Sequence, residues 1–306
     1  MTDHATFVPD EHMRRKRDAY WTDLVGGVTG RYKTAQVQRL LEGRTLPDGS
    51  SVIDVGAGTS DLSKMVAEYG GVAKIVCLDY DDAIVQEMRA AEEDPRVEWR
   101  TGDAGDLEAY GSDVGAVGFF DILHEVYSFV GRSPETGAVD HATGRAAVED
   151  ILRAAATALA PGGVILITDD VLPEEGDTAV RVRTRTEEIA TLIQRVEREY
   201  PSRPLEIAWE DDGRTFTIPA RTFITLLTHY NKPKNGDEAR WAVEQMEVHE
   251  YMKVSEYESF FGALGLTVST DVGTPPEAYA EWAGDFEVLG GLDDFPAKRV
   301  AVLAAK

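Results

Sequence analysis

Cysteine is almost absent from this sequence: Cys77 is the single one in 306 residues, so no disulfide can form within the chain. A fold that depends on a disulfide framework is thereby excluded, and a reducing compartment is expected. No apolar run approaches the length of a membrane-spanning helix, and no N-terminal stretch has the basic and apolar pattern of a signal peptide. We therefore expect a cytoplasmic protein that does not enter a membrane.

Basic residues are scarce beside acidic ones, 31 against 55, and the formal net charge is -24. Nucleic-acid binding rests largely on Lys and Arg replacing phosphate counterions, so a nucleic-acid partner is not expected. Two basic clusters stand out, Arg14 to Arg17 and Arg181 to Arg185. We interpret both as solvated helix faces, with a gate for an anionic small substrate as the alternative.

Strand and helix patterns alternate through the first half of the chain. Short β-branched or apolar runs predict five strands, and amphipathic segments between them predict helices. The expected strands lie near residues 50–55, 73–79, 96–101, 114–120 and 164–171. Such alternation is typical of an α/β doubly wound, Rossmann-like fold, for which we expect a seven-stranded sheet.

The pattern divides the chain into four parts. Residues 1–46 are predicted to form an N-terminal helical cap, and residues 47–173 the α/β core. Residues 174–251 show helical patterns and no convincing strand, which predicts a helical insertion that acts as a lid or a dimerisation surface. Strand and helix order returns in residues 252–306, which are expected to complete the core sheet. The amphipathic insertion helices make a homodimer an expectation.

The stretch "VIDVGAGTS", Val52 to Ser60, ends a predicted strand in glycines. Glycines there let the backbone turn tightly and approach a ligand beside the N-terminus of the next helix. Dinucleotide-binding enzymes use G-x-G-x-x-G, but the third position here is Asp61, whose charge would repel a pyrophosphate. NAD and FAD are therefore disfavoured, and so is a nicotinamide-dependent oxidoreductase.

With Asp54, Gly56 and Gly58, this stretch resembles the first motif of class I S-adenosylmethionine-dependent methyltransferases, although Ser60 replaces the last glycine. The resemblance extends over about residues 46–171, through "LDYD", "TGDAGDL" and "ALAPGGVILITD". It implies that Asp79 binds the ribose hydroxyls, that Tyr80 lies against the adenine and that Asp103 binds the adenine amino group. The residues that it implies for S-adenosylmethionine binding are Asp54, Gly56, Ala57, Gly58, Asp79, Tyr80, Asp103, Ala104 and Phe120.

The segment "DILHEVYSF", Asp121 to Phe129, follows the fourth strand, where this family places the reacting methyl group. Asp121 is a suitable N-cap for a short helix. We predict His124 as the base or as the group that orients the acceptor, with Glu125 polarising it or anchoring the chain. A purely structural His124 is the alternative. The candidate substrate-binding residues are Tyr20, Tyr32, Tyr127 and Asp169.

No metal site is expected, because the six histidines are scattered along the sequence without ligand spacing. The sequence thus predicts an S-adenosylmethionine-dependent methyltransferase that acts on an oxygen or nitrogen of a small molecule. A protein or peptide acceptor, or a non-catalytic module that only binds the cofactor, are the alternatives.

Overall fold

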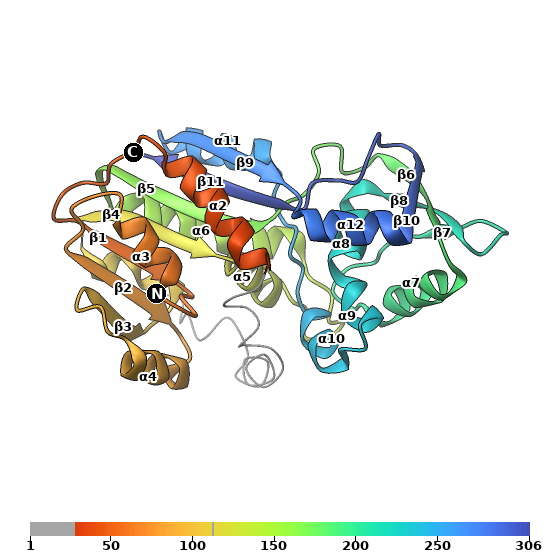
Figure 1. Cartoon of the computed structure of the whole chain (residues 1–306), viewed down its shortest axis with the longest axis horizontal. Coiled ribbons are helices and arrows are strands. Elements are labelled where there is room, and N and C mark those ends of the chain that lie inside the picture. The colour runs from red at the N-terminus through yellow and green to blue at the C-terminus, as the bar shows by residue number, and fades with distance from the viewer. Residues whose placement is uncertain (1–27, 112) are drawn as a thin grey trace.

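The computed structural model describes residues 28–111 and 113–306 (Figure 1). Predictions that concern earlier residues, including Tyr20 and the basic cluster from Arg14 to Arg17, lie outside the described residues. In the part of the chain that is described, no helix has both the length and the apolar character needed to cross a membrane.

A seven-stranded sheet forms the core and confirms the predicted fold. In spatial order its strands are β3 (Val97–Thr101), β2 (Lys74–Asp79), β1 (Ser51–Val55), β4 (Val114–Phe120), β5 (Leu159–Asp170), β11 (Arg299–Ala305) and β9 (Thr267–Gly273). The first five are mutually parallel, and β11 runs antiparallel to both of its neighbours. Every residue of β4 is buried, as expected for a central strand covered on both faces.

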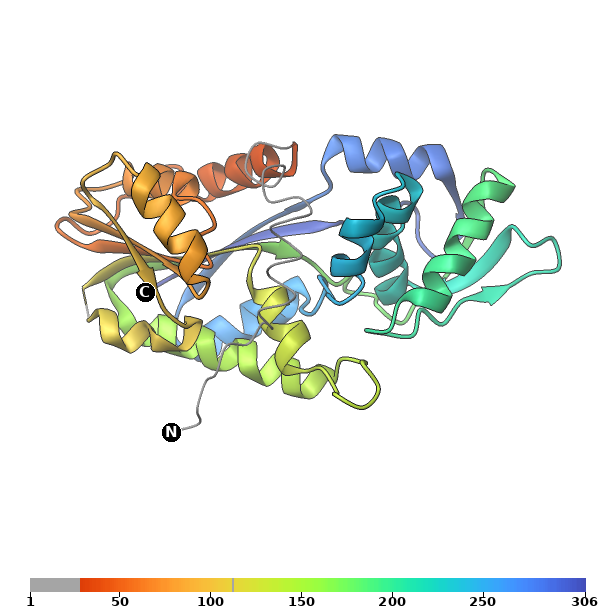
Figure 2. The same ribbon diagram turned by 90° about the horizontal axis from the view of Figure 1, so that it is seen from below.

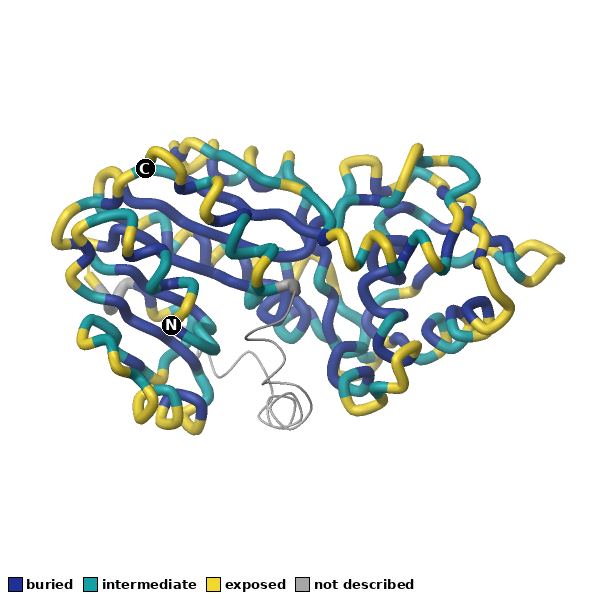
Figure 3. Tube along the Cα trace, in the orientation of Figure 1, coloured by how far each residue is buried: buried dark blue, intermediate teal, exposed yellow. Residues whose placement is uncertain are grey.

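Helices cover both faces of this sheet (Figure 2). On one face lie α2 (Val28–Leu41), α3 (Asp61–Ala67) and α4 (Asp82–Ala91), and on the other α5 (Leu123–Val130), α6 (His141–Ala158), α11 (Val254–Ala263) and the 3-10 helix η1 (Ala104–Tyr110). The strands between them form the most deeply buried part of the chain (Figure 3). Successive strand residues therefore point into different helical layers.

Acidic caps define the starts of two core helices. The Asp81 carboxylate accepts a hydrogen bond from the backbone of Ala83 at the start of α4 (3.0 Å), and Asp140 accepts one from Thr143 at the start of α6 (2.8 Å). Such caps satisfy backbone N–H groups that have no partner inside the helix. The cap of α4 lies two residues after the end of β2, so the end of this strand is tied to a defined helix start.

The insertion is not wholly helical, which corrects the sequence-based expectation. It contains β6 (Ala179–Thr184), β7 (Ala208–Trp209) and β8 (Thr215–Pro219), which join β10 (Phe286–Gly290) in an antiparallel sheet of order β10-β6-β8-β7. In β6, buried Val180 and Val182 alternate with exposed Arg181 and Arg183. This period of two is a strand pattern, so the expected basic helix face was wrong.

Five helices complete this second unit: α7 (Glu187–Glu199), α8 (Ala220–His229), α9 (Asn231–Lys234), α10 (Glu238–Glu244) and α12 (Pro276–Asp285). Residues 252–306 therefore do not only complete the core, because α12 and β10 lie in the second unit (Figure 1). The apolar face of α7 is buried within the chain through Ile189, Ile193 and Val196. This face is therefore not an exposed surface through which two chains could associate. The homodimer stays a prediction.

A buried ion network closes the core beside the second unit. Arg299, at the start of β11, binds the carboxylates of Asp170 (3.0 Å) and Asp121, and Lys298 binds Asp170 (2.8 Å). Lys33 of α2 also pairs with Asp121 (3.1 Å). Although burial opposes ionisation, Lys298 and Arg299 lower the pKa of Asp170 to about 2. The network therefore joins α2, β4, β5 and β11 at one place.

We expect Arg299→Met to destabilise the protein by about 3 kcal/mol, because Asp170 and Asp121 lose their shared buried partner and keep only Lys298 and Lys33. Urea denaturation at pH 7 measures this loss. Arg153→Met is the matched control: Arg153 pairs with Asp150 and Glu149 on the surface of α6, and its removal should cost less than about 1 kcal/mol. Equal effects of the two substitutions would contradict the structural role of Arg299.

Candidate active site

A cavity of 620 Å³ opens where the carboxyl ends of the core strands face the second unit. Open α/β sheets bind ligands at this edge, and the volume is in the usual range of ligand pockets. α2 contributes to its wall, as do the segments after β1, β2, β4 and β5 and the helices of the second unit. The core residues that line it include Asp54, Gly56, Ala57, Gly58, Asp79, Tyr80, Phe120, Asp121, His124, Glu125 and Asp170.

The loop after β1 forms a close-fitting glycine cradle. Gly56 and Gly58 have φ angles of 66° and 53°, which side chains rarely tolerate. A Cβ atom on Gly56 would lie 2.4 Å from the side chain of Ile122. Glycine is therefore required at Gly56 for both backbone conformation and space, and the predicted cradle lies in the cavity wall.

Asp54, in the same wall, is a buried carboxylate that lacks a hydrogen-bond partner. Its side chain is almost inaccessible, and neither oxygen accepts a well-formed hydrogen bond in the described residues. The nearby Ser63 hydroxyl, which donates to the carbonyl of Ser60, lowers the pKa of Asp54 only in part. Burial raises the pKa of Asp54 to about 8. An uncompensated carboxylate of this kind costs stability, which points to a ligand that supplies the missing donor.

Asp79 ends β2 and also faces the cavity. It accepts a hydrogen bond from the backbone N–H of Asp81 (2.9 Å), and burial raises its pKa to about 7. Phe120 lies across the same space at the end of β4, and Tyr80 lines it beside Asp79. The carboxylate and the two rings can bind a ligand that combines a vicinal diol with a flat aromatic part.

Asp103 and Ala104 are not among the residues that line this cavity. They lie at the start of η1, where the Asp103 carboxylate accepts a hydrogen bond from Gly105 N–H (2.8 Å). They are nevertheless close to the cavity, because the N–H of Gly102 donates to the backbone oxygen of Asp79 (3.1 Å). Their predicted contact with the adenine stays a prediction.

The predicted N-cap of α5 is wrong. The helix begins at Leu123 with Ile122 as its cap residue, and Asp121 has a φ of 59° and no capping bond. The Asp121 carboxylate is instead used by Lys33 and Arg299. Asp121 therefore forms ion pairs and does not cap the helix.

His124 is held by a carboxylate that the sequence did not predict for this role. Asp169 accepts hydrogen bonds from the backbone N–H of His124 (3.1 Å) and from its Nδ1 (2.8 Å). The other ring nitrogen, Nε2, lies 3.4 Å from Oε2 of Glu247. Burial alone would lower the pKa of His124, but Asp169 and Glu247 outweigh it and raise that pKa well above 6.5. The imidazolium form is therefore favoured, which donates hydrogen bonds and is not a ready base.

The two ring nitrogens of His124 face Asp169 and Glu247, and the predicted anchoring of the chain by Glu125 stays a prediction. Glu125 lines the cavity on the side of Asp79, whose pKa it helps to raise through charge repulsion. The expected partnership of His124 and Glu125 is thus replaced by that of His124 with Asp169 and Glu247. Sequence neighbours on a helix turn differ in direction by about 100°, so adjacency along the chain was a poor guide.

The predicted substrate-binding residues that the structure describes lie outside the cavity lining. Tyr127 is buried, contacts His141 through its hydroxyl (3.0 Å) and stacks on Tyr251. The hydroxyl of Tyr32 lies so close to Gly273 of β9 that a Cβ there would collide with it. Asp169 reaches the cavity only through His124. These three residues support the site without facing it.

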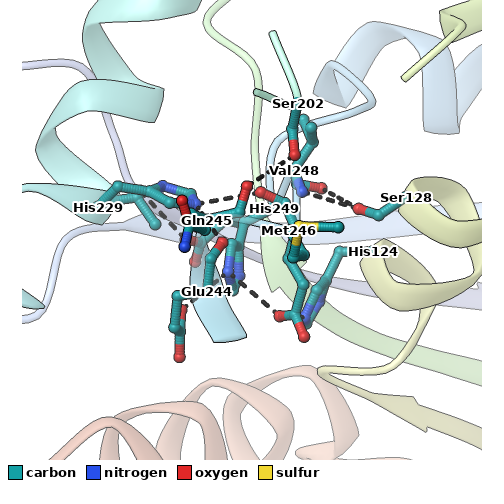
Figure 4. A network of polar contacts seen from close by, with 12 residues as sticks. His124, Ser128, Ser202, His229, Glu244, Gln245, Met246, Val248 and His249 are labelled. Atoms are coloured by element: carbon teal, nitrogen blue, oxygen red, sulfur yellow. Dashed lines mark hydrogen bonds and ion pairs between the residues drawn. The ribbon is translucent and has the colours of Figure 1, made fainter. Parts of the chain in front are cut away.

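Three histidines that are far apart in sequence come together beside the cavity (Figure 4). The rings of His124 and His249 stack with centroids 4.3 Å apart, and His229 lies 5.2 Å from His249. They come from α5, from α8 and from the segment after α10. The histidines are scattered along the sequence, as described, but these three lie close together in the structure.

Sequence reasoning missed Glu244 and Glu247, which bring carboxylates to these histidines. The Nε2 atom of His249 lies 3.2 Å from Glu244 and 3.6 Å from Glu247. The run "EQMEVHEY" has three glutamates around one histidine, which was the available signal. The sequence alone could not show that this segment faces the core, because that depends on where the second unit lies.

The comparisons with known proteins agree with this geometry. Residues 52–130 match the family model described as a methyltransferase domain. No curated protein matches the chain significantly.

Among the solved structures that share its fold, two illustrate the match. One is a chain of a complex between the Haloferax volcanii Trm112 methyltransferase activator and a methyltransferase, at 15% identity and a TM-score of 0.50, with 97% of this chain and 98% of that chain covered. The other is an S-adenosylmethionine dependent methyltransferase from Mesorhizobium loti, at 16% identity and a TM-score of 0.50, with 92% and 100% covered.

The matched segment begins in β1 and ends with α5, so it includes the glycine cradle, Asp79 and His124. The strand order and the cradle agree with the resemblance seen in the sequence. Residues 52–130 therefore match a methyltransferase domain, in agreement with the resemblance to class I S-adenosylmethionine-dependent methyltransferases seen in the sequence.

Proposed function

We propose that this chain binds S-adenosylmethionine beside β1, β2 and β4 and methylates an oxygen or nitrogen of a small polar molecule. The observation that carries the proposal is the continuity of the cavity. The residues that line this one cavity include Gly56 of the glycine cradle and Phe120. They also include polar residues of the second unit, such as Asn231 and Glu247. Cofactor and acceptor can thus share one enclosed space, as methyl transfer requires.

The cradle fits the cofactor on three observations. The carboxylate of Asp54 lacks a donor, the positive φ angles leave the backbone exposed to a ligand, and Asp79 offers oxygens suited to ribose hydroxyls. Glu125 and Asp79 together make this end negative, which suits a cationic ligand without phosphate. When bound, S-adenosylmethionine supplies a methyl carbon that the acceptor's lone pair attacks as the carbon–sulfur bond breaks, leaving S-adenosylhomocysteine and a proton.

The far end of the cavity is polar and largely charge-paired. Lys232 lies 3.2 Å from Glu244, and Lys298 is committed to Asp170. The Oδ1 atom of Asn231 is buried and has no hydrogen-bond partner in residues 28–111 and 113–306. An acceptor that donates hydrogen bonds, such as a hydroxyl or an amine, would satisfy this oxygen, whereas an apolar acceptor would leave it unpaired.

The burial of the polar groups inside the cavity favours a small acceptor molecule over a protein. His124 is 4% exposed and Glu247 is fully buried, so both are reached only from inside the cavity. A molecule that fits this space can contact both groups, whereas a folded protein could insert only a side-chain tip. The acidic surface also disfavours nucleic acid.

We assign His124 the role of orienting the acceptor. Asp169 holds its ring through Nδ1, so Nε2 points away from β5 and toward Glu247 and the cavity. In its imidazolium form the ring can donate a hydrogen bond to an acceptor oxygen and fix its direction. Direct displacement depends strongly on such alignment. A non-catalytic binding module would have no need for this polar wall.

The acceptor class is tested with methyl-labelled S-adenosylmethionine added to metabolites, protein and RNA fractionated from cell extract. We expect label in the metabolite fraction, reduced at least about tenfold with Asp79→Ala. Label that enters protein or RNA instead would contradict the small-molecule assignment. Tight S-adenosylhomocysteine binding without label in any fraction would support the non-catalytic alternative.

The role of Asp79 predicts a pH dependence of cofactor-product binding. Ribose hydroxyls bind the ionised carboxylate, and the pKa of about 7 means that Asp79 takes up a proton as the pH falls below neutrality. We expect the Kd of S-adenosylhomocysteine to rise roughly fivefold from pH 7 to pH 6, by calorimetry. Asp79→Asn should bind weakly with a flat profile, while Asp82→Asn keeps the slope. An unchanged slope in Asp79→Asn would assign the titration to another group.

The role of His124 predicts a separation of turnover from cofactor binding. In His124→Asn the labelling rate should fall at least about 100-fold, because the acceptor loses its orienting group. The Kd of S-adenosylhomocysteine should stay within about twofold. His141→Asn, which removes an imidazole that contacts the hydroxyl of Tyr127 outside the cavity lining, should retain the rate. A rate within about threefold of the wild type for His124→Asn would remove His124 from the reaction.

A further inference from the structure

Two imidazoles and one carboxylate converge on a single point of the cavity wall. The ligating atoms of His124, Glu247 and His249 all lie within 4.8 Å of one another. Oε2 of Glu247 is 3.4 Å from Nε2 of His124 and 3.6 Å from Nε2 of His249. Atoms that bind a common metal at roughly 2.0–2.2 Å lie about 3–3.6 Å apart, which the two distances to Glu247 match. The stacked rings of His124 and His249 would have to rotate apart so that both Nε2 lone pairs meet at one ion.

The surroundings of this cluster keep its ligands in place. Asp169 binds Nδ1 of His124, which leaves Nε2 as the outward atom, and metal-bound histidines commonly have such a carboxylate behind them. The hydroxyl of Ser128 accepts a hydrogen bond from Val248 N–H (2.7 Å), so the segment that carries the other two ligands is tied to α5 (Figure 4).

The neighbouring polar groups have other partners. Both ring nitrogens of His229 face backbone carbonyls: Nδ1 lies 3.0 Å from the oxygen of Thr225, and Nε2 lies 3.1 Å from the oxygens of Glu244 and Glu247. Burial lowers the pKa of His229 well below 6.5, so the neutral ring donates its single N–H on one of these two sides, and neither nitrogen faces the cluster.

Glu244 lies 3.2 Å from Lys232, which compensates its charge. It also lies 3.2 Å from Nε2 of His249, a contact that a metal ion would have to displace. The convergent set is therefore limited to three residues, all of which line the cavity.

We propose that His124, Glu247 and His249 form a binding site for one divalent transition-metal ion, open toward the acceptor end of the cavity. Two imidazoles and a carboxylate suit Zn²⁺, Fe²⁺, Co²⁺ or Mn²⁺, whereas Mg²⁺ and Ca²⁺ prefer oxygen ligands. Binding would replace the proton on Nε2 of His124. Metal binding stands independently of methyl transfer. Only the use of the ion to hold the acceptor oxygen or nitrogen rests on the proposed function. In the metal-bound protein the ion, and no longer the Nε2–H of His124, would orient the acceptor.

The alternative is an ion network without metal, in which the His124 imidazolium bridges Asp169 and Glu247. A direct measurement of metal binding distinguishes the metal site from this metal-free network. We would remove metal from the full chain with a chelator, use no polyhistidine tag, and titrate with Co²⁺ while recording visible absorption, with Zn²⁺ as a competitor. One Co²⁺ per chain, displaced by Zn²⁺, is expected.

Matched variants locate the ion. His249→Gln and Glu247→Gln should each weaken Co²⁺ binding at least about 100-fold, and Asp169→Asn by about 10–100-fold through the ring of His124. His141→Gln should bind like the wild type. Thermal unfolding and S-adenosylhomocysteine affinity report whether each variant is folded.

The wild-type titration decides the proposal even if a variant fails to fold. Absence of Co²⁺ and Zn²⁺ binding up to about 100 µM would overturn it, and so would unchanged binding in folded His249→Gln. Either negative result would leave cofactor binding at Asp79 untouched, because that is measured with S-adenosylhomocysteine in the absence of metal.

Discussion

The site depends on two adjacent buried carboxylates at the end of β5. Because neighbouring strand residues point to opposite faces of the sheet, Asp169 and Asp170 enter different layers. Asp170 binds Lys298 and Arg299, and Asp169 binds the backbone and the ring of His124. A buried carboxylate without a partner costs stability, and both of these carboxylates are paired. Asp169 and Asp170 thereby connect β11, the last strand of the chain, with α5, the helix that carries His124.

These pairings explain how the cavity acquires two different ends. At the cofactor end the carboxylates of Asp54 and Asp79 are buried with few donors, and their pKa values are raised to about 8 and 7. At the other end Asp170 and Glu244 have cationic partners, and their pKa values are lowered. The first end is suited to attract a cation that supplies donors, and the second is suited to hold a polar molecule in one orientation. His124 lies between them.

The core and the cradle could be predicted because their signals are local. Gly56 and Gly58 are needed for a backbone conformation, and Asp79 follows a strand that is visible as an apolar run. The second sheet was missed because Arg181 and Arg183 drew attention to charge and away from the alternation with Val180 and Val182. The cluster at His249 could not be predicted, since it depends on how the segment after α10 returns to α5. Tyr127 was misjudged because a polar hydroxyl near a site can serve packing alone.

A crystal structure of the chain with S-adenosylhomocysteine would test the central claim, that one cavity holds the cofactor at the cradle and the acceptor at the wall of the second unit. The account predicts that the ribose hydroxyls contact the Asp79 carboxylate and that the sulfur faces the space bounded by His124 and Glu247. Binding at another place, or with the sulfur directed away from that space, would contradict it.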